Sequence, residues 1–283
     1  MFDTPVALFI FNRPEVTRQT FEAIARAKPK RLALIADGPR HRADEAPCEL
    51  ARNIAGDVHW ECEVTKLFSD RNLGCRGNVS RGLDWVFSQF DSAIILEDDC
   101  VPATDFFEFC DLLLARYADD ERVTMIGGSA PAGGISSQFS YLFSRYTLIW
   151  GWATWKRAWS GYDVSMKAWP DDRDGGLLEH WLEDEGERLH WCRRFDKTHA
   201  GHTTWDHQWA WHCWRRAGLT ALPTTNLVTN IGFGSDATHT TSLADAARLS
   251  VPSGRIAFPL RHPTDVTRDA ALDARIYREI LNS

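Results

Sequence analysis

The sequence predicts an α/β fold in which a mostly parallel central sheet is flanked by helices. Short apolar runs of strand length alternate with amphipathic helical segments through the first half of the chain. This alternation is typical of strand–helix–strand crossovers, which place neighbouring strands parallel and cover both faces of the sheet. The 283 residues are 44% hydrophobic and 25% charged, which is sufficient for one large core and gives no sign of disorder.

The expected strands are apolar runs bounded by turn residues. In chain order they are 5–11, 31–36, 63–68, 93–96 and 123–126. The expected helices are 15–27, a segment that follows the turn at 72–74 and reaches 90, 104–117 with Thr104 as its N-cap, and 265–281. The rest of the second half is less regular, and we divide the chain into two halves of one domain, 1–127 and 128–283.

Charge and cysteine content narrow the function classes. The net charge of −7 argues against a nucleic-acid binder, so an anionic ligand would need a local basic pocket or a metal ion. Seven cysteines without a CxxC pair predict neither a disulfide framework nor a zinc site. The start of the chain lacks a basic segment and no apolar run approaches a membrane span, so we expect no integral membrane segment and a cytoplasmic location.

Tryptophan is unusually concentrated in the second half. Of thirteen tryptophans, eleven fall between Trp150 and Trp214. One interpretation is that these rings fill a core. The other is that several line a saccharide cleft, because aromatic faces stack on the apolar faces of sugar rings.

Charged side chains follow three of the predicted strands. Arg13 follows the first strand, Asp37 ends the second, and Glu97, Asp98 and Asp99 follow the fourth. Since ligands of open α/β sheets bind beyond the carboxyl ends of the strands, we expect these residues to face one crevice. Three adjacent acids after a buried strand need a compensating cation, and oxygen ligands suit Mg²⁺ or Mn²⁺.

The segment AIILEDDCVPATDFFEF at 93–109 resembles the metal-binding segment of GT-A fold glycosyltransferases. The similarity is greatest to the N-acetylglucosaminyltransferase I type and to related bacterial sugar transferases. The resemblance implies a GT-A, Rossmann-like sheet with an acceptor-side α/β half. It also implies that Asp99 binds Mn²⁺ or Mg²⁺, and that Glu97 and Asp98 contact the donor's sugar or ribose.

Further segments resemble the same family in the same order. The resemblance assigns Arg13 to the diphosphate, Asp37 to the nucleobase, and Gly151 and Trp152 to the place where sugar and acceptor meet. A histidine that follows the glycine-rich segment at 231–234 is implied as a metal or phosphate contact, and His239 matches it. Arg76 is a candidate for a further phosphate contact.

The segment WDHQW at 205–209 resembles the family's catalytic-base segment. Asp206 matches the first acid and would be the general base, whereas His207 and Gln208 depart from the family pattern. His207 is the alternative base, because the unperturbed pKa of histidine lies nearer neutrality.

The resemblance implies a metal-dependent, inverting glycosyltransferase, either a hexosyl- or an N-acetylhexosaminyltransferase. The donor would be a nucleoside-diphosphate sugar, with UDP as the first choice, and the acceptor a hydroxyl of a glycan or glycoconjugate, as in polysaccharide biosynthesis. The half 1–127 would bind the nucleotide sugar, and 128–283 would bind the acceptor and carry the base. The alternative is a non-catalytic carbohydrate-binding protein of the same fold. The C-terminal segment with Leu272, Ile276 and Ile280 would pack on the domain or form an oligomer contact.

Overall fold

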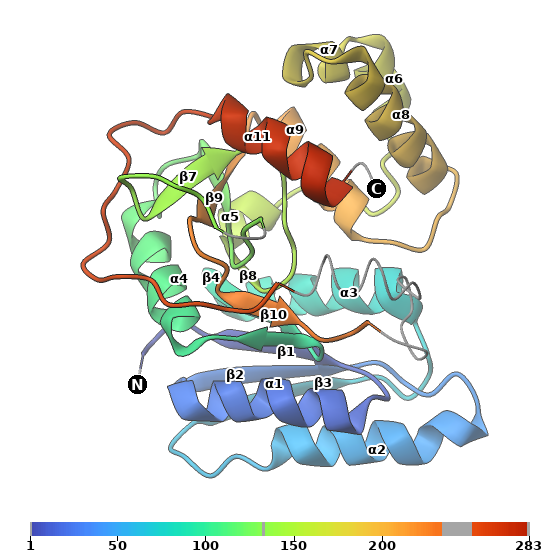
Figure 1. The fold of residues 1–283 in the computed structure, drawn as a ribbon. Coiled ribbons are helices and arrows are strands. Elements are labelled where there is room, and N and C mark those ends of the chain that lie inside the picture. The colour runs from blue at the N-terminus through green and yellow to red at the C-terminus, as the bar shows by residue number, and fades with distance from the viewer. Residues whose placement is uncertain (1, 132–133, 234–250, 282–283) are drawn as a thin grey trace.

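The structure is a computed structural model that describes residues 2–131, 134–233 and 251–281. Its centre is an eight-stranded sheet in the order β3-β2-β1-β4-β8-β6-β9-β7, beside a two-stranded sheet of β10 and β5 (Figure 1). Pairing in the eight-stranded sheet is parallel except where β8 meets β4 and β6, and where β7 meets β9. Strands β10 and β5 pair antiparallel. The predicted α/β class with a mostly parallel, helix-flanked sheet is therefore confirmed.

The strands are β1 (Val6–Ile10), β2 (Arg31–Ala36), β3 (Glu63–Phe68), β4 (Ser92–Glu97), β5 (Cys100–Pro102), β6 (Val123–Gly127), β7 (Tyr141–Ser144), β8 (Trp152–Trp155), β9 (Leu219–Pro223) and β10 (Val228–Asn230). The helices are α1 (Pro14–Ala27), α2 (Arg42–Gly56), α3 (Gly74–Gln89), α4 (Thr104–Arg116), α5 (Lys156–Trp159), α6 (Trp169–Asp174), α7 (Leu177–Trp181), α8 (Glu185–His199), α9 (Asp206–Arg215), α11 (Ala270–Ile276) and a π-helical turn η1 (Tyr277–Leu281).

Strand β1 lies between its parallel partners β2 and β4, and this register positions the predicted site. Phe9 lies opposite Glu97 of β4 and Ile35 of β2. The segments that follow these three strands therefore leave the sheet at the same edge. The polar residues that follow these strands lie at that edge, as the sequence predicts.

The first half follows the sequence pattern closely, whereas α2 was not expected. Val6, Ala7 and Leu8 are fully buried, as a strand covered on both faces requires. Helix α2 contains Pro47 and packs on α1. Pro47 lies in the second turn of α2, where its missing N–H removes the bond to the Ala43 carbonyl.

The second half supplies both core and sheet. Strand β8 inserts antiparallel between β4 and β6, so the two predicted halves share one sheet. Every tryptophan from Trp152 to Trp214 is buried, and Trp152 stacks on Trp205 with 5.6 Å between ring centroids. The core interpretation of the tryptophan-rich region is therefore correct for these rings.

Cap residues explain two of the differences between the predicted and the observed helix boundaries. Thr104 is the first residue of α4 rather than its N-cap, because Ala103 has the extended conformation of a cap residue and no side chain caps the helix. The C-terminal helix begins at Ala270, not at Asp265, with the Asp269 side chain accepting from the Leu272 N–H at 2.8 Å.

The apolar stripe of α11 packs within the chain. Leu272 and Ile276 are buried, and Asp273 accepts a 2.6 Å hydrogen bond from the Ser144 hydroxyl of β7. All seven cysteines are free thiols. Within the described ranges, no helix is both long and apolar enough to cross a bilayer.

Candidate active site

The three acids lie at the carboxyl end of the central strands. Glu97 is the last residue of β4, and Asp98 and Asp99 form the turn into β5. The backbone of this turn is held from both sides, since the Thr20 hydroxyl donates to the Asp98 carbonyl and the Ile231 N–H donates to the Asp99 carbonyl, each at 2.8 Å. Asp98 is buried, whereas Glu97 and Asp99 are half-buried.

Arg13 is the cation that faces these acids. It occupies the N-cap position of α1, and its guanidinium contacts the Asp98 carboxylate and donates to Asp99 at 2.8 Å. Burial lowers the pKa of Arg13, but the two carboxylates raise it more, so the group stays charged. A single guanidinium is thus the counter-ion at a turn that carries three carboxyl groups.

Glu97 and Asp98 retain protons more readily than free carboxyl groups do. Burial, followed by the charges of Asp99 and Asp98, raises the pKa of Glu97 to about 8. Burial also raises the pKa of Asp98 to about 6, with Asp99 adding to the effect and Arg13 opposing it. The cluster therefore carries more negative charge than its surroundings stabilise.

Asp206 belongs to the same electrostatic environment. It is the first residue of α9, and its carboxylate accepts a hydrogen bond from the Thr204 hydroxyl. Asp206 is among the charges that raise the pKa of Glu97. The structure thus brings the predicted base, far away in sequence, near the acids that follow β4.

His207 is committed to the packing of α9 against α8. Its Nε2 lies 3.1 Å from the Arg194 guanidinium, which can only donate, and its Nδ1 lies 2.9 Å from the Thr198 hydroxyl. Burial lowers the pKa of the His207 ring, with Arg194 contributing in the same direction. The lone pair that a base would use is thus occupied by Arg194.

Asp37 is satisfied by the chain itself. Its two carboxylate oxygens accept from the N–H groups of Gly38, Leu73 and Gly74 and from the Asn72 side chain, at 2.8 to 3.0 Å. These bonds join the end of β2 to the start of α3. A nucleobase would have to replace one of these donors to reach the carboxylate.

The contacts that the structure gives Arg76, Gly151 and Trp152 are with residues other than the acids 97–99. The Arg76 guanidinium donates to the Val164 carbonyl at 3.0 Å. The Trp152 ring is 1% exposed, so its faces are used by neighbouring tryptophans rather than offered to a ligand. Gly151 has a φ of +65°, and a Cβ there would lie 2.6 Å from Val228, so glycine is required by both conformation and space.

The glycine-rich segment after β10 lies against the acids. A Cβ on Gly232 would lie 2.1 Å from an Asp99 carboxylate oxygen, so only glycine allows this approach. The next residue, Phe233, packs edge-on against Trp150 with 5.7 Å between ring centroids. Two segments that the sequence singled out thus meet beside Asp99. His239 lies outside the described residues.

The acids match a hard divalent cation in their chemistry. Among residues 2–131, 134–233 and 251–281, no group of three His, Cys, Asp or Glu side chains is arranged to hold a metal ion by itself. Mg²⁺ commonly takes only one or two protein carboxylates and completes its shell with water and phosphate oxygens. Asp99, a half-buried carboxylate beside a cluster short of positive charge, fits that role.

Three residues near the site were not predicted. Burial raises the pKa of the Cys75 thiol, and the nearby charges raise it further. They belong to Glu97, Asp206, Asp99 and Asp37. Tyr162 donates to the Trp205 carbonyl at 2.9 Å, and Thr204 orients Asp206. The rule that ligands bind beyond the carboxyl ends of strands could have identified Cys75, because it follows the turn after β3. Nothing in the sequence around Tyr162 and Thr204 points to the site.

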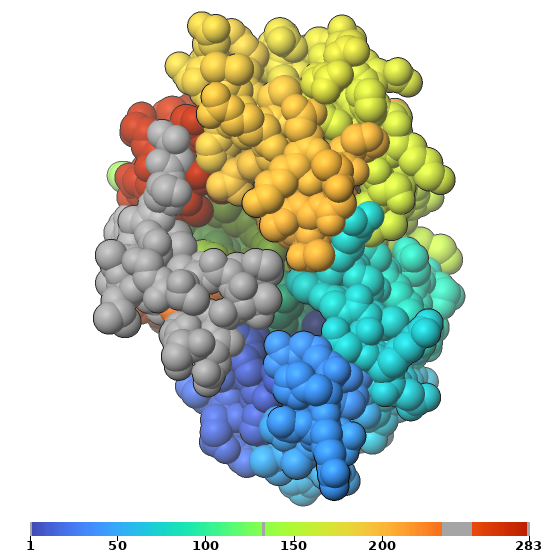
Figure 2. Space-filling model, turned by 90° about the vertical axis from the view of Figure 1, so that its right-hand side faces the viewer, coloured from blue at the N-terminus to red at the C-terminus, as the bar shows by residue number. Residues whose placement is uncertain are grey.

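The surface is hollowed where these segments meet. Figure 2 shows a depression bordered by the blue N-terminal segments, the cyan helix α3 and the orange segment at the start of α9. The depression thus lies where the N-terminal segments, α3 and the start of α9 meet at the surface.

Comparisons with known proteins locate no family. No protein-family model matches the chain, and no curated protein matches it. Among solved structures, 4-diphosphocytidyl-2C-methyl-D-erythritolsynthase of Anaerococcus prevotii is 10% identical with a TM-score of 0.34, over 64% of this chain and 78% of that one. Mannose-1-phosphate geranyltransferase of Thermus thermophilus is 10% identical with a TM-score of 0.37, over 78% and 73%. HddC of Yersinia pseudotuberculosis is 10% identical with a TM-score of 0.33, over 54% and 77%. At these values the likeness carries no argument about function.

Proposed function

We propose that this protein is a metal-dependent, inverting glycosyltransferase that moves a sugar from a nucleoside-diphosphate sugar to a hydroxyl of a glycan or glycoconjugate. One observation carries the proposal. The acids that follow β4, their counter-ion Arg13 and the carboxylate of Asp206 share one electrostatic environment at the carboxyl edge of the sheet. This is where ligands of open α/β sheets bind.

The acids and Arg13 would receive the diphosphate of the donor. Asp99 would hold Mn²⁺ or Mg²⁺, which supplies Lewis-acid neutralisation of the departing diphosphate. Arg13, already held by Asp98 and Asp99, would donate to the same phosphate oxygens without having to be ordered first. Glu97 and Asp98 would accept hydroxyl hydrogens of the donor's sugar or ribose.

Asp206 would act as the general base. Its carboxylate would take the proton of the acceptor hydroxyl while the acceptor oxygen bonds to the anomeric carbon and the bond from that carbon to the phosphate oxygen breaks. Thr204 orients one carboxylate oxygen, which leaves the other for the acceptor. We favour Asp206 over His207 because Arg194 occupies His207 Nε2.

The first experiment measures binding of the donor's leaving group. Unfolding of the protein is followed with UDP, GDP, CMP, dTDP or ADP, each with EDTA or with Mn²⁺. A ligand at 100 times its dissociation constant adds about 2.7 kcal/mol to the free energy of unfolding. We expect one nucleotide to stabilise the protein only with metal.

Two variants make the result specific. Asp99→Asn should abolish the metal-dependent stabilisation, and Asp119→Asn, which changes an exposed acid away from the site, should not. Stabilisation by free oligosaccharides but by no nucleotide would instead favour a non-catalytic carbohydrate-binding protein.

A further inference from the structure

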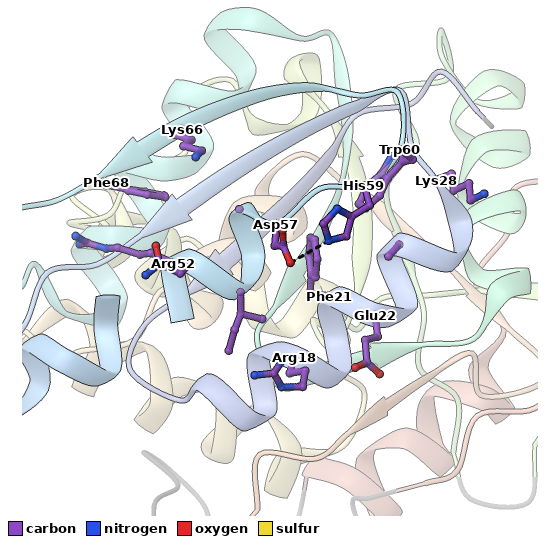
Figure 3. Close-up of a pocket in the computed structure, with 14 residues that line it drawn as sticks. Arg18, Phe21, Glu22, Lys28, Arg52, Asp57, His59, Trp60, Lys66 and Phe68 are labelled. Atoms are coloured by element: carbon purple, nitrogen blue, oxygen red, sulfur yellow. Dashed lines mark ion pairs between the residues drawn. The ribbon is translucent and has the colours of Figure 1, made fainter. Parts of the chain in front are cut away.

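A second cavity lies away from the acids, on the α1 and α2 side of the sheet. It has a volume of about 800 Å³ and is bounded by α1, the end of α2, the loop 57–60 and β3 (Figure 3). Ligand sites commonly have volumes of about 300 to 1,000 Å³. None of the acids 97–99 nor Asp206 lines this cavity.

One wall of the cavity is a fixed aromatic surface. The Trp60 indole donates to the Pro29 carbonyl at 2.8 Å and packs on the Phe21 ring with 5.9 Å between centroids. Trp60 remains half-buried, so part of its ring is accessible. A ring already fixed in place loses little entropy when a ligand stacks on it.

The cavity is richer in cations than in acids. Four lining residues carry a positive charge and two a negative one: Arg18, Lys28, Arg52 and Lys66 against Glu22 and Asp57. Asp57 pairs with His59 at 3.0 Å. For Lys28 and Lys66, both exposed, no acid of the described residues lies within ion-pair distance. Such a local excess stands out in a chain of net charge −7.

The cations are spread around the cavity rather than gathered at one point. Figure 3 shows Lys66 and Phe68 on one side, Lys28 beside Trp60 on the other, and Phe21 between them. Arg52 donates to the carbonyls of Asp37 and Ser69, at 2.9 and 2.7 Å. These bonds hold its side chain in place as part of the cavity wall. A single phosphate would meet one of these lysines, whereas an extended ligand with separated charges would meet both.

We propose that this cavity binds an acidic oligosaccharide, with a sugar ring against Trp60 and its acidic groups at Lys28 and Lys66. Carbohydrate fits better than nucleic acid because the net charge of −7 repels a long polyanion. The inference goes beyond the proposed function and does not depend on it, because it requires neither metal nor nucleotide.

Calorimetric titration of the whole protein in EDTA tests the proposal. The probes are tetragalacturonate, a heparin-derived tetrasaccharide, neutral maltotetraose, monomeric galacturonate and a ten-residue oligothymidylate. We expect at least one acidic tetrasaccharide to bind, more tightly than maltotetraose or the monomer and more weakly as salt is raised. Lys28→Gln with Lys66→Gln should weaken binding about five- to tenfold, the size expected for two exposed ion pairs.

The controls separate this site from general charge and from the active site. Lys167→Gln with Lys197→Gln removes two exposed lysines elsewhere and should leave affinity unchanged. Asp99→Asn should also leave it unchanged. The proposal is overturned if neither acidic tetrasaccharide binds, if maltotetraose or the monomer binds equally well, if the two lysine pairs have equal effects, or if the oligothymidylate binds with the same dependence on Lys28 and Lys66.

Discussion

Replacing Arg13 with glutamine removes the only guanidinium that contacts the acid turn among the described residues. The side chains of Arg13 and Asp98 are 22% and 5% exposed. Breaking a buried ion pair from one side costs about 3 to 5 kcal/mol, because the other charge remains unpaired. Since Arg13 is partly solvated, we expect Arg13→Gln to lower the free energy of unfolding by about 3 kcal/mol at pH 8.

The loss should depend on pH. In the wild-type protein the folded-state pKa of Asp98, about 6, and of Glu97, about 8, lie above the ordinary values, so the folded state holds protons that the unfolded state releases. Stability therefore falls as pH rises from about 4 to about 8. Without Arg13, the pKa of Asp98 rises further. Between pH 6 and pH 8 the higher pKa of Asp98 in the variant adds about 1.4 kcal/mol per pH unit to the loss of stability, or nearly 3 kcal/mol in all.

Urea unfolding in EDTA at pH 5 and pH 8 measures this difference. At pH 5 Asp98 is mostly protonated, so Arg13→Gln should cost less than about 1 kcal/mol. The matched control is Arg122→Gln, which removes an exposed partner of Asp120 and should change stability little, and equally, at both pH values. Equal losses at pH 5 and pH 8 for Arg13→Gln would refute the reasoning.

Three further outcomes are expected. With the donor identified by the binding experiment, Asp206→Asn should lower turnover at least about 100-fold without loss of nucleotide binding, and His207→Gln should lower turnover far less. The turnover of both variants is measured as nucleotide released during transfer. A larger loss for His207→Gln than for Asp206→Asn would assign the base to His207. Leu272→Ala should cost about 3 kcal/mol in urea unfolding with no change in mass by light scattering, because the side chain is 3% exposed within the chain; a change in mass would indicate an oligomer contact. Burial lowers the pKa of His212 to about 4, so protonation of the unfolded state removes up to about 3 kcal/mol between pH 6.5 and pH 4. His212→Gln keeps a donor for the Ala158 carbonyl, 2.9 Å away, and should flatten that part of the pH profile; an unchanged slope contradicts the assignment.

Much of the first half could be predicted from sequence because its signals are local. Continuous apolar runs identify strands covered on both faces, and their polar ends identify the edge at which ligands bind. That reasoning was sufficient to place Arg13 at the same edge as Asp98 and Asp99, and the structure adds that they form ion pairs. It was not sufficient for α2, in which Pro47 and a mixed pattern conceal the helix.

The sequence by itself determined the parallel strands of the first half and the edge of the sheet at which Arg13 and the acids 97–99 lie. Only the tertiary structure decided that β8 enters the sheet antiparallel, that Trp152 belongs to the core, that Asp37 holds the start of α3, and that His207 turns toward Arg194. The reason is physical. A strand and its end are specified by neighbouring residues, whereas the direction of a side chain depends on partners far away in sequence, which only packing brings within hydrogen-bond distance.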